Sequence, residues 1–557
     1  MNIVWCKMKI SNNAISIHDL TFKRNSFAFK IDLLSINLNE VPKVIKVRKA
    51  EIRQVADLRK TDKKKSRTNL EVHTLAIKFK KRHQLIKNIL TKVIFSINEI
   101  EIISNRGKAS LYNIFSENPT IKGELNKLSA ISNSKYKFKI SILEHNIKIS
   151  INRLEKDTTD IFSFNKLLAK VDFSDHSKLL VSTFIHLGQL YHPTISRERV
   201  EIEYFKAKQF LPLEDTQIFG GDESYIDIDG NVIFYSIVRH NLPNKNINLS
   251  IFLQIYSSLS KLIDIIPSPT NPELKTLLDD GNFLAEIDFH INLEDLKNSI
   301  LSFKFYKNDY NIINIDWDLS YLNNKFPLST YKHSMLVYSG STDQSISNFA
   351  KKVIIINEDP SFFQHSGIEP MAIGLAIIRN FKSGNTKVGG STISMQLVKN
   401  LFMDESRTLA RKLEEAIITV LLENYYSIKK HRILAVYFQV IEFAPGVFGI
   451  ENGSYFYFGK ESNSLTTIQA LTLSYIVPRP RFFLDAVLTR SQQLDRNLSN
   501  YIENMLENLY FRNLISDIDI NSFLTEIEFS ENIGKLYLEN LKIDRVLKRI
   551  QDQKLLQ

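Results

Sequence analysis

Apolar and polar residues alternate along much of the first 330 residues of the chain. The runs Phe27–Ile31, Phe138–Ile142 and Ile147–Ile151 carry an apolar side chain at nearly every second position. A period of two is typical of half-buried antiparallel strands, because successive side chains point to opposite faces of a sheet. The pattern therefore predicts that this part of the chain is rich in β-structure.

One pair of these runs also predicts its own connection. Asp229-Gly230 lies between two alternating runs within Tyr225–Phe234. Asp-Gly tolerates the left-handed backbone that a two-residue hairpin turn requires, so a hairpin is expected here. Later strands are expected at Phe283–Leu293 and at Ile312–Leu322.

The period changes from about residue 345 onwards, where apolar positions recur at helical spacing. After residue 490 a helical stripe of apolar and aromatic side chains continues towards the end: Leu494, Leu498, Tyr501, Ile502, Met505 and Leu509. We therefore expect an α+β chain in three parts. These are a β-rich region at 1–335, a mainly helical domain at 336–490 and a helical tail at 491–557.

Composition and charge narrow the class of protein. The 557 residues include 72 basic and 61 acidic side chains, a net charge of +11, which suits an anionic partner. A single cysteine, Cys6, excludes an intramolecular disulfide framework and any multi-cysteine metal site. The basic run at 59–67 is expected to be a solvated loop, with contact to an acidic surface as the alternative. No run of about 18 apolar residues occurs, so no membrane-spanning helix is expected in the chain as written.

Glycines gather in one window of the helical part. Nine of the 18 glycines lie between residues 351 and 460, and glycine concentrates where backbone turns sharply or approaches a ligand. Five short stretches that carry candidate functional residues fall in this window. They read EDPSFFQHSG from Glu358, GGSTISMQLVKN from Gly389, RTLARKLEE from Arg407, KHRILAVYF from Lys430, and EFAPGVFGIENGSYFYFGK from Glu442.

Even without reference to any known family, these stretches contain the types of residue that a glycosyl-transfer site needs. Two carboxylates, Glu358 and Glu415, could divide the work of base and electrostatic partner. Four cations lie between them, enough to hold a pyrophosphate: Lys399, Arg407, Arg411 and Lys412. On one helix, Arg407, Arg411 and Glu415 would form a single stripe. The backbone amides at Gly389-Gly390 could approach phosphate oxygens.

Each part has a plainer interpretation when taken alone. Glu358-Asp359 could simply complement a helix dipole, and Ser391-Thr392 could be a helix N-cap. The arginine stripe could be a solvated helix face, and His365 could be a hydrogen-bonded structural histidine. Tyr437 and Phe438 are expected in the core. The joint order and spacing of the five stretches favour the chemical interpretation.

That joint pattern resembles the peptidoglycan glycosyltransferase family (glycosyltransferase family 51), over about residues 340–490. The segment from Glu442 to Glu451 is most similar to the monofunctional branch. Four positions depart from the family motifs: Met395, Ala435, Phe438 and Gln439. These departures bear on substrate fit and turnover more than on reaction type, because neither glutamate is affected.

The resemblance implies a lysozyme-like helical fold and a set of residue roles. Glu358 would be the general base on the acceptor 4-hydroxyl of lipid II, and Glu415 would assist departure of undecaprenyl pyrophosphate. Substrate groups would be bound or positioned by Lys399, Arg407, Arg411, Lys412, Ser391, Gln396, Asp359, Gly390 and Thr392. The expected product is a β-1,4 glycan strand formed with inversion. No metal site and no obligatory cofactor are implied, with a divalent cation such as Mg²⁺ as an optional addition.

The resemblance also implies partners and a location. Lipid II, the nascent glycan strand and a membrane surface are expected, at the periplasmic face of the bacterial inner membrane; nucleic acid is not. The stretch Met371–Phe381 is either the membrane-contacting region of such enzymes or a buried core helix. The anchor is expected upstream of this chain, with peripheral attachment as the alternative. The β-rich part weakly resembles AsmA-like periplasmic modules in its repeated strand pattern. It could serve as a spacer, as a lipid groove or as a platform for other cell-wall proteins.

Two further functions stay open. A catalytically silent domain could bind lipid II or cell-wall partners without turnover, and the altered fourth motif favours this slightly. A glycan-cleaving, lysozyme-like enzyme would also use a central glutamate. Lys399 and Arg407 argue against cleavage, because a hydrolase acting on polymeric glycan has no pyrophosphate to bind. No transpeptidase pattern of serine and lysine follows residue 490.

Overall fold

The computed structural model divides the chain into two compact units. The first comprises Met1–Ile315 with Arg407–Ala410, and the second comprises Asp316–Ser406 with Arg411–Gln557. The structure describes residues 2–10, 14–24, 27–37, 43–54, 87, 93–104, 107–117, 119–128, 132–155, 162–175, 178–212, 218–220, 223–241, 247–292, 300–306, 311–323, 347–383, 389–521 and 523–556. The basic run at 59–67 and the predicted boundary at 335 lie outside these residues.

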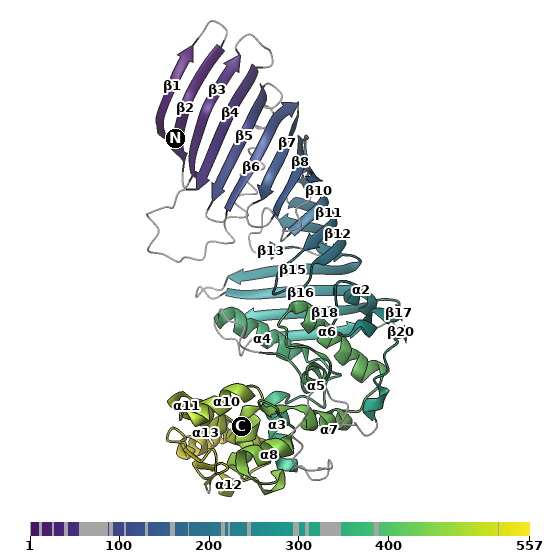
Figure 1. The fold of residues 1–557 in the computed structure, drawn as a ribbon, viewed down its shortest axis with the longest axis vertical. Coiled ribbons are helices and arrows are strands. Elements are labelled where there is room, and N and C mark those ends of the chain that lie inside the picture. The colour runs from purple at the N-terminus through teal and green to yellow at the C-terminus, as the bar shows by residue number, and fades with distance from the viewer. Residues whose placement is uncertain are drawn as a thin grey trace. The chain divides into compact units, whose positions relative to one another are not determined.

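Among the described residues, the first unit is built on one sheet, which contains 18 strands. Figure 1 shows this sheet. Neighbouring strands pair in antiparallel fashion, and β4 and β5 form a parallel pair. The strands are β1 (Asn2–Ile10), β2 (Ala14–Arg24), β3 (Phe27–Asn37), β4 (Lys43–Gln54), β5 (Val93–Ser104), β6 (Gly107–Glu117), β7 (Thr120–Leu128), β8 (Ser132–Ile142), β9 (Asn146–Glu155), β10 (Phe162–Asp172), β11 (Lys178–Leu190), β12 (Val200–Pro212), β13 (Ile218–Phe219), β14 (Tyr225–Ile228), β15 (Asn231–Asn241), β16 (Ile247–Ser257), β18 (Phe283–Asn292) and β19 (Ile300–Tyr306).

The predicted hairpin is confirmed. Strands β14 and β15 pair across Asp229 and Gly230, with Ile228 opposite Asn231. Both turn residues have positive φ, 49° for Asp229 and 82° for Gly230. This backbone matches the twist of the flanking strands, which is why Asp-Gly is favoured at such turns.

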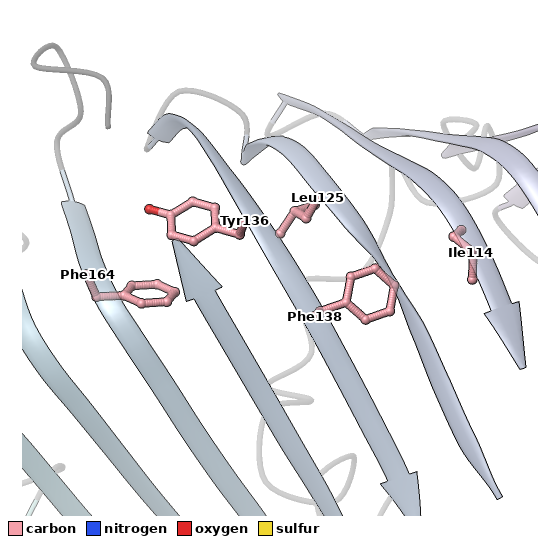
Figure 2. Close-up of a cluster of buried hydrophobic side chains, with 5 residues drawn as sticks. All are labelled: Ile114, Leu125, Tyr136, Phe138 and Phe164. Carbon is pink, nitrogen blue, oxygen red and sulfur yellow. The ribbon is translucent and has the colours of Figure 1, made fainter. Parts of the chain in front are cut away.

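The alternating pattern gives this sheet its apolar cluster, shown in Figure 2. Five buried side chains from β6, β7, β8 and β10 gather there: Ile114, Leu125, Tyr136, Phe138 and Phe164. Gly123 on β7 lies opposite Phe138 on β8. A Cβ atom at Gly123 would lie 2.7 Å from the Phe138 ring, so the ring occupies the space that a side chain would fill. The glycine is therefore a packing requirement of this sheet.

One strand prediction is only partly right. Ile312–Leu322 was expected as a strand, but the pairing is limited to β20 (Asn311–Asn314), which pairs with β17 (Leu278–Asp280). The 3₁₀ helix η3 (Ser320–Asn323) follows. The alternation ends at Asp316-Trp317-Asp318, and the Asp318 carboxylate accepts the Ser320 N–H and so stabilises a turn. The first unit also contains α2 (Leu259–Asp264) and η1 (Pro272–Thr276).

The second unit is mainly helical, as predicted (Figure 1). Its elements after η3 are α3 (Asn348–Glu358), α4 (Pro370–Ser383), α5 (Ile393–Phe402), α6 (Leu409–Val420), the π-helical turn η6 (Leu421–Tyr425), α7 (Lys430–Val440), β21 (Glu442–Ala444), β22 (Val447–Phe448), α8 (Ile450–Phe458), η7 (Ser462–Ser464), α9 (Thr467–Ile476), α10 (Pro480–Leu488), α11 (Gln492–Phe511), α12 (Asp517–Asn521), β23 (Glu526–Glu528), β24 (Lys535–Tyr537) and α13 (Ile543–Leu556). The α+β fold class is therefore confirmed.

The C-terminal residues pack onto this helical unit. Most of the predicted stripe, including Leu494, Leu498 and Ile502, is buried along α11. The tail also contains the β23–β24 hairpin, which the sequence did not predict. Phe529, just after β23, stacks on Phe458 with ring centroids 5.5 Å apart. These contacts make the tail part of the same core as α8.

No helix among the described residues has the length and apolar character needed to cross a membrane. The stretch Met371–Phe381 forms most of α4, where Met371 is exposed and Ala376 is buried. Its contact with a membrane stays a prediction.

Candidate active site

Glu358 ends α3 and faces two amide side chains. The Asn357 side-chain amide donates to Glu358 Oε1 at 2.7 Å, and Gln396 Nε2 donates to Glu358 Oε2 at 2.8 Å. Burial raises the pKa of the Glu358 carboxyl, while these hydrogen bonds and the charge of Lys399 oppose that rise. A carboxylate that is oriented by two amides and has a raised pKa is a stronger base than a free glutamate and is suited to accept a proton.

A buried tyrosine fixes the orientation of the amide on Gln396. The Tyr437 hydroxyl donates to Gln396 Oε1 at 3.0 Å, which leaves Gln396 Nε2 to donate to Glu358. Tyr437 lies on α7 and its side chain is fully buried. The sequence predicted a core residue here, which is correct, but it gave no signal for this hydrogen bond. Asn357 was likewise missed.

Asp359 connects the first two motifs. Its buried carboxylate accepts from His365 Nε2 at 3.0 Å and from the Ile393 N–H at the start of α5, also at 3.0 Å. His365 Nδ1 accepts the Gly367 N–H, so the proton lies on Nε2. These contacts are those of a loop-positioning group and a structural histidine. They hold the loop that follows Glu358, and contact of Asp359 with substrate stays a prediction.

The glycine-rich segment is held tightly against its neighbours. A Cβ atom at Gly390 would lie 2.7 Å from the Cα atom of Ile373 on α4. Thr392 is the N-cap of α5, and its hydroxyl also donates to the Gly367 carbonyl at 2.6 Å. Packing and capping thus account for Gly390 and Thr392 in this structure. Their contact with substrate stays a prediction.

Glu415 lies in a cluster of cations on α6. Its side chain is 1 % exposed, Arg411 Nη1 donates to Oε2 at 3.2 Å, and Lys412 Nζ pairs with Oε1. Lys412 Nζ also donates to the Ser391 hydroxyl at 2.6 Å. The carboxylate therefore holds two cations in place beside the glycine-rich segment.

Lys399 on α5 is electrostatically coupled to both glutamates. Burial lowers the pKa of the Lys399 ammonium, Arg411 and Lys412 act in the same direction, and Glu415 and Glu358 oppose them. Lys399 still has an exposed surface. Lys399 therefore lies on the solvent-accessible side of the site, where it interacts electrostatically with both Glu358 and Glu415.

The prediction for Arg407 needs a correction. The sequence placed Arg407, Arg411 and Glu415 on one helical stripe, but α6 begins at Leu409, after Arg407. The Asp404 carboxylate accepts the Ser406 N–H in a local turn just before this point, which favours a loop over a helix. Arg407 is exposed and groups with the first unit, and its contact with substrate stays a prediction.

Three of the four motif departures lie in the core. Met395, Ala435 and Phe438 are all at most 5 % exposed. Gln439 is half-buried, and its carbonyl oxygen lies close to Gly449. These three side chains lie in the packing of α5 and α7, and the hydrogen bonds to Glu358 and Glu415 are present alongside them.

A second buried ion pair supports this framework. Glu423, in the π-helical turn η6, accepts from the Ser394 hydroxyl and from Lys430 Nζ, the latter at 2.9 Å. Lys430 Nζ also lies 4.3 Å from the centroid of the Phe362 ring. This pair joins α5, η6 and α7 to the loop after Glu358, and the sequence analysis did not identify it.

Among the residues that the structure describes, no three His, Cys, Asp or Glu side chains gather as a metal site would require. The site combines a half-buried carboxylate of raised pKa, Glu358, with a second carboxylate, Glu415, that holds cations. That is the class of site that glycosyl transfer from a pyrophosphate-linked donor requires.

Comparison with known proteins gives the family. The transglycosylase family profile matches residues 331–505. A biosynthetic peptidoglycan transglycosylase of Nitrosomonas eutropha is 41 % identical over 165 residues, covering 30 % of this chain and 65 % of that protein. The biosynthetic peptidoglycan transglycosylase of Janthinobacterium sp. is 39 % identical over 165 residues, covering 30 % of this chain and 68 % of that protein. The protein of the same name from Methylobacillus flagellatus is 41 % identical over 165 residues, covering 30 % of this chain and 69 % of that protein.

The chain therefore belongs to the peptidoglycan transglycosylase family, and the resemblance seen in its motifs is confirmed. The match covers only the helical unit. The sheet of the first unit lies outside it.

Proposed function

We propose that the protein polymerises lipid II into β-1,4 glycan strands with release of undecaprenyl pyrophosphate. The observation that carries the proposal is Glu358, a half-buried carboxylate with a raised pKa that Gln396 and Asn357 orient beside Lys399. Family membership supports the reaction class, and the geometry around Glu358 supports its role as the base.

In the proposed step, a Glu358 carboxylate oxygen takes the proton of the acceptor 4-hydroxyl. The hydroxyl oxygen attacks the donor anomeric carbon from the face opposite the pyrophosphate. The bond between that carbon and the phosphate oxygen breaks, and its electron pair leaves with the pyrophosphate. Attack from the opposite face inverts the anomeric centre and gives the β-linkage.

The negative charge that develops on the leaving group needs cations. Glu415 has both carboxylate oxygens paired, with Arg411 and Lys412. It is therefore better suited to hold these cations against the pyrophosphate than to donate a proton. Lys399 would add a further charge, and Ser391, bonded to Lys412, would help to position a phosphate oxygen. A divalent cation would have to be held largely by the pyrophosphate itself.

The two alternatives differ in what they require of these residues. A silent lipid II-binding domain has no need of a base with a raised pKa, yet the contacts of Glu358 are intact. A glycan-cleaving enzyme has no need of the cation cluster around Glu415. The altered positions Met395, Ala435 and Phe438 are buried, which weakens the argument for a silent domain.

The proposed setting is the periplasmic face of the bacterial inner membrane, where lipid-linked donor and growing strand would meet the site. The residues after 490 fold with the helical unit and carry no serine–lysine pattern. We therefore attribute polymerisation to the helical unit, and no cross-linking activity to the residues after 490.

The test presents the purified chain with fluorescent lipid II and, separately, with preformed glycan strands. The proposal predicts a ladder of polymer from lipid II that a muramidase digests, and no shortening of preformed strands. Binding of lipid II without polymer would support the silent domain. Shortening of preformed strands would support a hydrolase.

A further inference from the structure

One face of the sheet in the first unit carries rows of lysines. Two adjacent rows run across strands β8 to β14, each made of residues directly opposite one another. One row is Ser141, Lys148, Lys170, Ser182, Lys208 and Tyr225, and the next is Lys139, Ser150, Leu168, Phe184, Lys206 and Asp227. Because alternate residues of a strand share a face, both rows lie on the same side of the sheet.

Two pairs within this face bring like charges together. Lys148 lies directly opposite Lys170, and Lys139 lies directly opposite Lys122 on β7. Like charges opposite one another across two strands destabilise a sheet. An anion shared between them would remove that repulsion.

The lysines are only partly neutralised by the protein. Lys170 pairs with Asp172 at 2.6 Å, Lys208 pairs with Glu223 at 3.0 Å and Lys206 pairs with Asp227 at 3.7 Å. Lys122, opposite Lys139, pairs with Glu117. Within the part of the chain that the structure describes, Lys139 and Lys148 have no carboxylate within ion-pair distance, and both are exposed.

These rows line a shallow hollow of about 520 Å³. Leu168 and Phe184 lie opposite each other within it, and Leu168 is 36 % exposed. The hollow therefore offers cations at its edges and an apolar pair between them. A purely hydrophilic polyanion would gain nothing from that pair, whereas a lipid presents a phosphate next to apolar carbon.

We propose that this hollow binds the phosphate headgroups of anionic phospholipids at a membrane surface, with Lys139 and Lys148 as the principal phosphate contacts. The charge complementarity and the apolar pair within the hollow carry this assignment. It is independent of the glycosyltransferase site, because every residue involved lies in the first unit.

The test measures binding of the full chain to vesicles of phosphatidylcholine, with and without phosphatidylglycerol. The test variant is Lys139→Gln with Lys148→Gln. The control variant, Lys46→Gln with Lys304→Gln, removes the same charge from exposed positions of the sheet that do not line the hollow. A third variant, Lys139→Arg with Lys148→Arg, keeps the charge.

A lysine near an anionic surface accounts for about a five-fold change in partitioning, so losing two predicts a loss of about 30-fold for the test variant. The control should lose clearly less, the arginine variant should bind like the wild type, and vesicles without phosphatidylglycerol should bind weakly. Equal losses in test and control variants would overturn the proposal. So would tighter, lysine-dependent binding of soluble polyphosphate than of anionic vesicles. Circular dichroism of each variant checks that the sheet is folded.

Discussion

Replacing Gln396 by leucine should move the pH dependence of catalysis in a defined direction. The change removes the 2.8 Å hydrogen bond that stabilises the ionised Glu358 carboxylate and keeps a side chain of similar size. That hydrogen bond lowers the pKa of Glu358, opposing the rise caused by burial. Without it, the pKa of Glu358 must rise further.

The magnitude follows from the strength of a hydrogen bond to a charged group. Such a bond contributes about 1.5 kcal/mol at the lower end of its range. A pKa change of one unit corresponds to about 1.4 kcal/mol. The variant should therefore show a Glu358 pKa about one unit higher than the wild type.

The assay is kcat/KM for lipid II polymerisation as a function of pH. A general base works when ionised, so the rate rises with pH through the pKa of Glu358, and the acidic limb should move up by about one unit. Tyr437→Phe is the companion variant: it removes the hydroxyl that orients the Gln396 amide but keeps the amide itself, so it should move the limb in the same direction by a smaller amount. An acidic limb that stays in place or moves to lower pH in Gln396→Leu would refute the reasoning.

Two further predictions concern stability, measured as the midpoint of urea unfolding. Lys430→Met leaves the buried Glu423 carboxylate without its cation and should cost about 3 kcal/mol; adding Glu423→Gln should restore much of this, and an additive loss would contradict the pairing. Gly453→Ala places a Cβ atom 2.6 Å from the Phe443 ring and should cost about 1–3 kcal/mol. Gly389→Ala, with no atom within 4 Å of the added Cβ, should be nearly neutral, and an equal loss there would contradict the packing argument.

The sequence predicted most of the architecture because the relevant signals are local. Period-two alternation identifies the strands, and Asp229-Gly230 encodes its own turn. The failure at Ile312–Leu322 has a local cause as well, because Asp318 caps a turn where a short alternation ends. The β23–β24 hairpin was missed because its strands have three residues each, too few to show a period.

The candidate site residues could be predicted only where they belong to motifs whose order along the chain is recognisable. Glu358 and Glu415 follow from the motifs, whereas the bond between Tyr437 and Gln396 joins residues 41 positions apart. It depends on how α5 and α7 pack, which no local pattern reports. The start of α6 after Arg407 likewise depends on the turn at Asp404.

The central claim is that Glu358 is the base of a lipid II polymerase. The most direct measurement compares the wild type with Glu358→Gln for polymer formed from fluorescent lipid II, alongside binding of the same substrate. The account predicts muramidase-sensitive polymer from the wild type, none from the variant, and similar lipid II binding by both. Polymer from Glu358→Gln at the wild-type rate would contradict it.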